Sequence, residues 1–541
     1  MYPSFVFEKK VRRNAILCLL LCVVITLAVQ IFAHAAMTNW YTVEVSNITF
    51  ENQNGLTVRG KLYKPENATE ANPAPGVVYL HGYQNNRETS DPYGIELSRR
   101  GFVVITLDAL GRGNSDNQFS ESEPGFDPTY GADTAFEFLQ NLPYVDPDRC
   151  GMGGHSLGGE WSYTAALENP DVQAIVFSGF AYQDNGTYTT PKNMLMIFGK
   201  YDEYRQRMTG TRDFEAEWMS STQTIAAIAN PDPTLDTTYG DFSDGTARRV
   251  HMTHTTHVSE SFDKGAIAEA INWFSHALNP GVSLSIPANQ QIWRIKEVGS
   301  LIAMIAGILS AVPLGILLLG IKPFAMLAQA PKTTYMCSKK TFWRSFGING
   351  GLTLTYLGLV MVIFGIHVYL VPIDKIFPMM MVNGVIFWFL VINIFGFFIF
   401  RGWMKKQRGS QAEANYQELG ISEAKDRIKL SWPKIWRSLL LATILFAFIY
   451  ALEAIPESFL LIDFRYKFPY ASDLTPYRFL MMLLYFPLFL IGFLQVNILL
   501  QGQLCPAPGK TWLHTTLRKS LGGIFVMLVP LLVHMALQYI P

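Results

Sequence analysis

Five consecutive residues in the first half of the chain have the types and spacing that serine chemistry requires. Gly154-His155-Ser156-Leu157-Gly158 fits the pattern G-x-S-x-G and joins a short apolar run directly to a stretch with helical spacing. A serine held in a tight turn between strand and helix projects its hydroxyl from the sheet, and the flanking glycines leave room for that turn. The pattern therefore predicts that Ser156 is a nucleophile that attacks an acyl carbon.

The elements that must position this serine alternate between strand-like and helix-like patterns. Two alternating runs, 42–50 and 56–63, meet at Asn54-Gly55, a strong hairpin signal. Apolar runs that suit strands buried on both faces follow at 76–80, 102–107, 150–154, 172–178, 194–198 and 247–252. Helical spacing is found at 130–142, 157–167 and 259–278. This order predicts a mostly parallel sheet with helices on both faces, which binds ligands at the carboxyl ends of its strands.

Several motifs at the ends of these strands make residues 40–278 similar to the α/β-hydrolase superfamily, particularly its esterase, dienelactone-hydrolase and prolyl-oligopeptidase-like branches. The motifs are Leu80-His81-Gly82-Tyr83, Asp108-Ala109-Leu110-Gly111-Arg112-Gly113-Asn114-Ser115, Gly154-His155-Ser156-Leu157-Gly158-Gly159 and Gly199-Lys200-Tyr201-Asp202, followed by a late histidine. The chain order of nucleophile, acid and histidine matches that of the family. The resemblance implies an α/β-hydrolase fold, and it does not extend to the apolar second half of the chain.

The resemblance also implies a catalytic triad of Ser156, Asp202 and His257. Ser156 would pass its proton to the histidine and form an acyl-enzyme that water then hydrolyses. Asp202 would fix the tautomer of the histidine and stabilise its charged form. Glu203 is the weaker candidate for the acid, and the alternative is that Asp202 belongs only to a surface turn.

Three histidines lie close together, so the base must be chosen among them. His251 belongs to an expected strand, whereas His257 ends the loop where the family places its base. We therefore choose His257, with His254 as the alternative. A zinc site is disfavoured, because a three-residue spacing along a strand alternates faces and no acidic or Cys ligand pattern accompanies the histidines. The sequence predicts no metal and no cofactor.

Two backbone donors are expected to stabilise the negative charge that develops on the acyl oxygen. The N–H of Leu157 directly follows the nucleophile, and the loop that begins at His81 should supply the second donor, the N–H of Tyr83. His81, Gly82 and His155 are expected to border the substrate. The alternative is that His81 and Gly82 only shape a turn and that His155 is structural.

An insertion follows Asp202. Only residues 179–192 separate the sixth and seventh strand-like runs, which is too short for the cap that many relatives carry. Residues 203–245 form an insertion instead, with helical spacing at 211–229. We expect this insertion either to cover the pocket, with Trp218, Met219 and Tyr239 lining an apolar site, or to pack on the scaffold.

Seven apolar runs are long enough to cross a bilayer as helices. They are residues 15–36, 298–321, 346–371, 376–400, 435–455, 479–500 and 521–540. Lys and Arg collect at alternate ends of these runs, which predicts a cytoplasmic N-terminus. The expected organisation is a cytoplasmic segment (1–14), a transmembrane anchor (15–36), an extracytoplasmic domain (40–285) and an all-α helical transmembrane domain of six helices (298–541). The alternative for the first run is a signal peptide cleaved near Ala33-His34-Ala35, which also exports the domain.

Composition limits the classes of function. The formal net charge is +0, so nothing indicates a nucleic-acid partner. Residues 40–285 contain one cysteine, Cys150, and therefore no internal disulfide. We expect an exported membrane enzyme that hydrolyses carboxylic esters or related acyl bonds, with a small-molecule or lipid-derived acyl substrate and the lipid bilayer as partners. The alternatives are an exopeptidase or acyltransferase with the same triad, or a transporter or sensor whose hydrolase-like domain only binds ligand. The natural substrate, the role of the last six spans and the oligomeric state stay open.

Overall fold

The computed structural model describes residues 8–279, 281–328, 337–407, 415–469, 473–502, 504 and 511–538. The chain forms two compact units, each of which is described by itself. The α/β unit comprises Leu17–Pro313 and Ala447–Ser472, and the helical unit comprises Met1–Ile16, Leu314–Phe446 and Asp473–Pro541.

The α/β unit is built on an eight-stranded sheet with the order β1-β2-β4-β3-β5-β6-β7-β8. The expected hairpin is present, and the side chain of Asn52 accepts hydrogen bonds from the backbone N–H groups of Asn54 and Leu56 in its turn. β2 pairs antiparallel with β4, and all later pairings in this sheet are parallel. The strands are β1 (Val43–Glu51), β2 (Thr57–Pro65), β3 (Ala74–Leu80), β4 (Val103–Asp108), β5 (Val145–His155), β6 (Ala174–Ser178), β7 (Met194–Gly199) and β8 (Arg248–Thr253).

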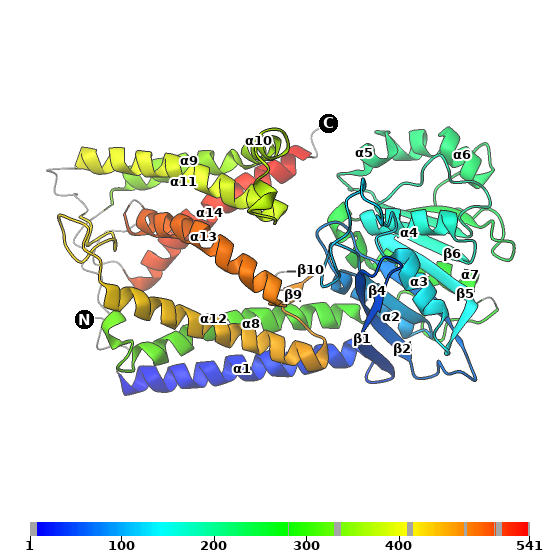
Figure 1. The fold of residues 1–541 in the computed structure, drawn as a ribbon, viewed down its shortest axis with the longest axis horizontal. Coiled ribbons are helices and arrows are strands. Elements are labelled where there is room, and N and C mark those ends of the chain that lie inside the picture. The colour runs from blue at the N-terminus through cyan, green and yellow to red at the C-terminus, as the bar shows by residue number, and fades with distance from the viewer. Residues whose placement is uncertain are drawn as a thin grey trace. The chain divides into compact units, whose positions relative to one another are not determined.

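Helices cover both faces of this sheet (Figure 1). α3 (Ala132–Gln140) and α4 (Leu157–Glu168) pack on one face, and α2 (Asp91–Ser98) and α7 (Lys264–Leu278) pack on the other. Every residue of β3, β4, β6 and β7 is buried, as expected for apolar strands covered on both sides. The predicted α/β-hydrolase fold is confirmed.

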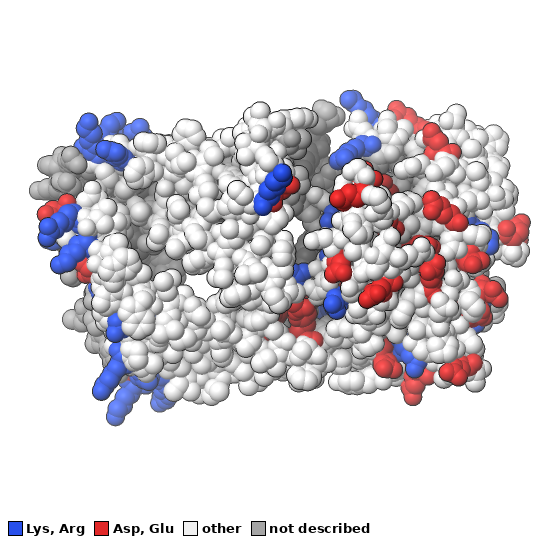
Figure 2. Space-filling view, viewed as in Figure 1, with Lys and Arg blue, Asp and Glu red and all other residues white. Residues whose placement is uncertain are grey.

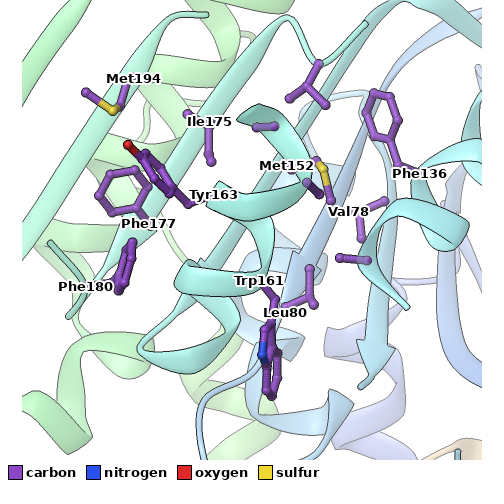
Figure 3. Packing of buried hydrophobic residues seen from close by; sticks show 14 of the residues in the cluster. Val78, Leu80, Phe136, Met152, Trp161, Tyr163, Ile175, Phe177, Phe180 and Met194 are labelled. Carbon is purple, nitrogen blue, oxygen red and sulfur yellow. The ribbon is translucent and has the colours of Figure 1, made fainter. Parts of the chain in front are cut away.

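Aromatic side chains pack α4 against the sheet. The rings of Tyr163, Phe177 and Phe180 pack with centroids 5.6 to 5.8 Å apart (Figure 3). Such ring pairs add about 1 kcal/mol each beyond the burial of their surface. Because α4 begins directly after Ser156, this packing also fixes the strand end that carries the serine.

The core on the other face includes the ends of two long helices. Ala33 and Met37 of α1 (Lys9–Met37) are buried in the same cluster as Tyr63 of β2. Trp293 of α8 (Trp293–Leu319) is buried there too, with its ring centroid 6.1 Å from that of Phe262. The end of α1 is thus part of the core of the α/β unit.

The insertion after Asp202 packs on the scaffold. It forms α5 (Arg205–Thr209), a π-helical turn (Phe214–Trp218, η3) and α6 (Thr222–Ile228). Trp218 and Met219 are buried in the same core as α3 and α4, with Tyr239 partly buried against it. The hydroxyl of Tyr182 donates to Thr224 Oγ1 at 2.7 Å and ties α6 to the segment after β6. The second of the two expected arrangements is therefore the one observed for Trp218 and Met219.

The helical unit contains α9 (Lys339–Leu354), α10 (Tyr356–Tyr369), α11 (Met380–Gln407), α13 (Pro476–Gln501), α14 (Trp512–Gln538) and the first half of α12 (Trp432–Leu460). Polar groups join α11 to α13. The Tyr485 hydroxyl donates to Asn383 Oδ1 at 2.7 Å, and Gln495 Nε2 donates to the carbonyl of Asn393 at 2.5 Å. Interhelical hydrogen bonds of this kind are typical of helices that associate in lipid.

Long apolar helices are the second feature of the chain. Among the described residues, five helices are long and apolar enough to cross a membrane (α1, α8, α11, α12 and α13), and there are six if the bent pair α9–α10 is counted as one span. α14 covers the described part of the last predicted run, and residues 539 and 540 of that run lie outside the described residues. Figure 2 shows Asp and Glu side chains spread over the α/β domain, whereas much of the visible surface of the long helices carries no charge. These helices are compatible with a membrane protein.

Candidate active site

Ser156 occupies a sharp turn between β5 and α4. Its φ of 54° and ψ of −119° are unfavourable for a residue with a side chain, a kind of strain that clusters at functional sites. A Cβ atom on Gly154 would lie 2.3 Å from the carbonyl oxygen of Gly158, and one on Gly158 would lie 2.5 Å from that of His81. Glycine is required at both positions because the turn brings backbone segments into direct contact.

His257 lies between Ser156 and Asp202. Its Nε2 is 3.0 Å from Ser156 Oγ, and its Nδ1 is 2.9 Å from Asp202 Oδ2. The carboxylate selects the tautomer with the proton on Nδ1, which leaves Nε2 free to accept the serine proton. Asp202 and His257 are buried and Ser156 is partly exposed. The structure therefore brings together the three residues predicted as the triad, from the ends of β5, β7 and β8.

The competing candidates lie elsewhere. His254 is exposed, with its ring centroid 6.4 Å from that of Tyr201, and His251 is paired with Asp236. The carboxylate of Glu203 accepts a hydrogen bond from the backbone N–H of His257 at 3.2 Å. Glu203 thus contacts the backbone of the loop that carries the base, whereas Asp202 contacts its ring.

The two predicted oxyanion residues come from segments that adjoin the serine. Leu157 is the first residue of α4, so its N–H lies at the positive end of the helix dipole. Gly82, directly before Tyr83, lies so close that a Cβ atom on it would be 3.3 Å from Ser156 Cβ. An anion that develops beside Ser156 would therefore lie near both segments.

The rings of His81 and His155 hold the backbone of the site. His81 Nδ1 donates to the carbonyl of Gly82 at 2.8 Å, and its Nε2 accepts from the N–H of Ala109 at 3.3 Å. His155 Nε2 donates to the carbonyl of His257 at 2.9 Å. Burial lowers the pKa of each ring to about 4, so both are neutral at neutral pH. These buried rings hydrogen-bond to the backbone of the loop at Gly82 and of His257, whereas the sequence analysis expected them to border the substrate.

Glu260 is a site residue that the sequence analysis missed. It is fully buried in η4 (His257–Phe262), and its Oε1 accepts from the N–H of Gly199 at 2.5 Å. Its Oε2 lies 3.3 Å from His155 Nε2 and 3.9 Å from His257 Nδ1. Burial and then the charge of Asp202 raise the pKa of Glu260 well above its usual range. The raised pKa favours the neutral form of Glu260.

His155, His257 and Glu260 also have ligand atoms close enough together to surround a metal ion. Both ring nitrogens of His257 are already within hydrogen-bond distance of Ser156 and Asp202. A metal on either nitrogen would displace one of these contacts. We therefore interpret the cluster as a hydrogen-bonded support of the base.

Three exposed tyrosines lie on the chain segments that follow β3 and β7, and one of them contacts His257. The ring of Tyr204 meets that of His257 edge to face with centroids 4.9 Å apart, and the guanidinium of Arg112 lies 5.3 Å from the centroid of Tyr83. Tyr83, Tyr201 and Tyr204 are 49%, 52% and 38% exposed. Of these three, the sequence analysis singled out only Tyr83, for its backbone.

Comparison with known proteins bears on the same part of the chain. The profile of the family described as "Serine aminopeptidase, S33" matches residues 71–243, which include Ser156 and Asp202. An uncharacterized Escherichia coli protein is 27% identical over 133 residues, which cover 24% of this chain and 44% of that protein. A thiohydrolase of Aspergillus aculeatus is 30% identical over 135 residues, covering 24% and 40%, and human dipeptidyl peptidase 8 is 30% identical over 145 residues, covering 24% and 16%. The chain thus spans less than half the length of these curated relatives.

Solved structures show likeness at lower identity. An S-formylglutathione hydrolase from Agrobacterium tumefaciens aligns with 17% identity and a TM-score of 0.32, covering 44% of this chain and 97% of its own. An esterase from Pyrococcus furiosus aligns with 13% identity and a TM-score of 0.32, covering 44% and 94%. The family match, the strand order and the turn at Ser156 support a place for the α/β unit in the α/β-hydrolase superfamily, with a serine hydrolase-like fold.

Proposed function

We propose that the protein is a membrane-anchored serine hydrolase that cleaves a carboxylic ester or related acyl bond. One observation carries the proposal: a serine in a strained strand–helix turn lies 3.0 Å from an imidazole whose other nitrogen lies 2.9 Å from a buried carboxylate. This arrangement is the one that raises the nucleophilicity of a hydroxyl at neutral pH.

The same geometry supports a two-step reaction. Ser156 Oγ attacks the acyl carbon as His257 Nε2 takes the hydroxyl proton, and the carbonyl electrons move onto oxygen. The N–H groups of Leu157 and Tyr83 are proposed to stabilise that oxyanion, a role worth about 100-fold or more per donor. His257 then returns the proton to the leaving alcohol as the ester C–O bond breaks. Water attacks the acyl-enzyme by the same route and releases the acid.

Covalent labelling tests the proposal directly. The full chain in detergent should react with a fluorophosphonate probe, and Ser156→Ala should abolish both labelling and hydrolysis of a short p-nitrophenyl ester. Ser220→Ala is the matched control, because Ser220 is an exposed serine of the same unit outside the site. Full labelling of the Ser156→Ala protein would refute the proposal.

An aminopeptidase-like activity is the second candidate. It is favoured by the description of the matching family profile and by the partial similarity to dipeptidyl peptidase 8. The hydrogen-bonded groups at Ser156 could serve amide as well as ester hydrolysis, since function depends on the whole site rather than the fold. Turnover of aminoacyl p-nitroanilides at rates above those of p-nitrophenyl esters would favour the peptidase.

The membrane location and the side of the α/β unit belong to the proposal. Support comes from the long apolar helices and from the concentration of Lys and Arg at 9–13 and 401–437. Cysteine labelling of intact cells with a membrane-impermeant maleimide tests the orientation. A cysteine at the exposed position of Ser220 should react, and one at the exposed position of Lys425 should react only after permeabilisation. The reverse pattern would place the α/β unit in the cytoplasm.

A further inference from the structure

Buried charges connect the loop after Tyr83 to a distant part of the α/β unit. Arg465 lies in the short segment that follows α12 and is 0% exposed. Its guanidinium forms a close ion pair with Asp463, two residues earlier in the same segment. A buried arginine with one such neighbour still has donors to satisfy, and those donors reach the α/β fold.

The remaining donors of Arg465 meet the loop that links β3 to α2. Its Nη1 donates to Asn86 Oδ1 at 3.2 Å, and its Nη2 lies 3.4 Å from Glu88 Oε2. These two residues follow Tyr83 by three and five positions. Arg465 therefore contacts the loop from outside the β-strands and helices that carry Ser156 and His257.

Hydrogen bonds restrain the loop on both sides of Asn86. The N–H of Asn85 donates to the carbonyl of Gly82 at 3.3 Å, which closes a turn around Tyr83. On the other side, the N–H of Arg87 donates to Asp108 Oδ1 at 2.8 Å. A displacement of Asn86 would thus be passed to Tyr83 through a closed turn of four residues.

A second contact from a long helix holds the far end of the same loop. Lys296 Nζ of α8 lies 2.8 Å from Asp91 Oδ2, and both side chains are 0% exposed. The neighbouring Glu297 accepts from the backbone N–H of Lys467, two residues after Arg465, at 2.8 Å. The segment after α12 and the start of α8 are therefore joined to each other as well as to the loop.

We propose that Arg465 is a positioning residue that holds the loop at Asn86 and Glu88 so that the N–H of Tyr83 stays aimed at the acyl oxygen. The hydrolase site is then completed by a segment more than 170 residues beyond α7 in the chain, next to one of the long apolar helices. This inference rests on the proposed function. Its alternative is that the buried charges only stabilise the fold, which predicts effects on unfolding and none on turnover by folded protein.

The test uses the full chain in detergent and compares Arg465→Met with Arg294→Met. Arg294 is an exposed arginine of α8 whose guanidinium lies 5.3 Å from the ring centroid of Trp293, so it controls for loss of a cation near the long apolar helices. We expect Arg465→Met to lower kcat for a p-nitrophenyl ester about 10- to 100-fold, the scale of a lost oxyanion donor, with KM changed less than about threefold. Arg294→Met should match the wild type. Binding of a boronic acid, which imitates the tetrahedral state, should weaken by the same factor as kcat/KM falls.

Asn86→Ala keeps the test decisive if Arg465→Met does not fold. It removes the hydrogen bond to Arg465 and leaves the buried ion pairs intact, so the unfolding temperature should stay near that of the wild type while kcat falls about tenfold. If Arg465→Met folds and its kcat equals that of the wild type, the inference is overturned. If Arg465→Met does not fold, a wild-type kcat in Asn86→Ala overturns it. If wild-type protein itself resists fluorophosphonate at Ser156, the proposed function fails instead, and the two failures are distinct.

Discussion

Glu260 Oε2 lies 3.9 Å from His257 Nδ1, the nitrogen that also contacts Asp202. Two carboxyl groups this close to one another and this deeply buried do not both ionise readily. Burial, followed by the charge of Asp202, raises the pKa of Glu260 well above its usual value, which favours the neutral form of Glu260. The raised pKa therefore reduces the negative charge that Glu260 presents to the imidazole of His257.

Glu260→Gln tests the raised pKa of Glu260 through the pH dependence of stability. Because the folded-state pKa of Glu260 is raised, its contribution is fully present below the ordinary value of 4.5 and is lost as pH rises toward the folded value. Gln is neutral at every pH and has a similar shape, so the variant lacks this loss. We expect the unfolding temperature of the variant to rise relative to that of the wild type as pH increases above about 4.5. A difference that stays constant over this range would show that Glu260 is ionised in the folded protein.

Asp202→Asn should lower kcat about 10³- to 10⁴-fold with little change in KM. The amide of Asn can donate to Nδ1, which would favour the tautomer with its proton on Nε2 and prevent that atom from accepting the proton of Ser156. Glu203→Gln is the control, because Glu203 contacts only the backbone N–H of His257 in the site. Steady-state kinetics on the two variants checks the assignment. A larger loss in Glu203→Gln than in Asp202→Asn would make Glu203 the acid.

Gly179→Ala should displace Glu260 and His257 within the site. Gly179 has φ +61°, and a Cβ atom on it would lie 2.2 Å from Glu260 Oε2 and 2.8 Å from His257 Cε1. Gly210 has a similar φ of +71° but open space around it, so Gly210→Ala carries the backbone strain alone, about 1 kcal/mol. We expect kcat to fall at least about tenfold in Gly179→Ala and to stay unchanged in Gly210→Ala. If Gly179→Ala and Gly210→Ala had the same effects on kcat and on unfolding temperature, the clash at Gly179 would be relieved without moving His257.

The sequence allowed the sheet and the hydrogen-bonded trio to be predicted because both depend on local patterns. The expected strand at 102–107 is β4 at Val103–Asp108, and the apolar run at 194–198 is β7 at Met194–Gly199. α2 was not expected, because all eight of its residues are buried and it therefore lacks the polar face of an amphipathic helix. β5 begins five residues before the expected 150–154, since polar residues at its start hide the pattern.

Other parts of the site depend on contacts that no local pattern records. Glu260 looks like any acidic residue near a helix start, and its neutral state follows only from full burial beside Asp202. Lys296 and Arg465 read as charges flanking apolar runs, whereas the structure pairs them with residues more than 200 positions away. Burial and long-range pairing decide these roles, so they become visible only in three dimensions.

His155→Gln should change the acid stability of the protein. The folded-state pKa of His155 is lowered to about 4 by burial, against about 6.5 for an exposed ring, so the unfolded chain binds the proton more readily. Stability from this residue is therefore lost as pH falls from about 6.5 to 4, by up to about 3 kcal/mol. Gln can still donate to the carbonyl of His257 but does not titrate. The unfolding temperature of the variant should therefore rise relative to that of the wild type as pH falls from about 6.5 to 4. His254→Gln, at an exposed position outside the contacts of His155, should follow the wild-type curve. Parallel curves for His155→Gln and the wild type would mean that the buried ring is already charged in the folded protein.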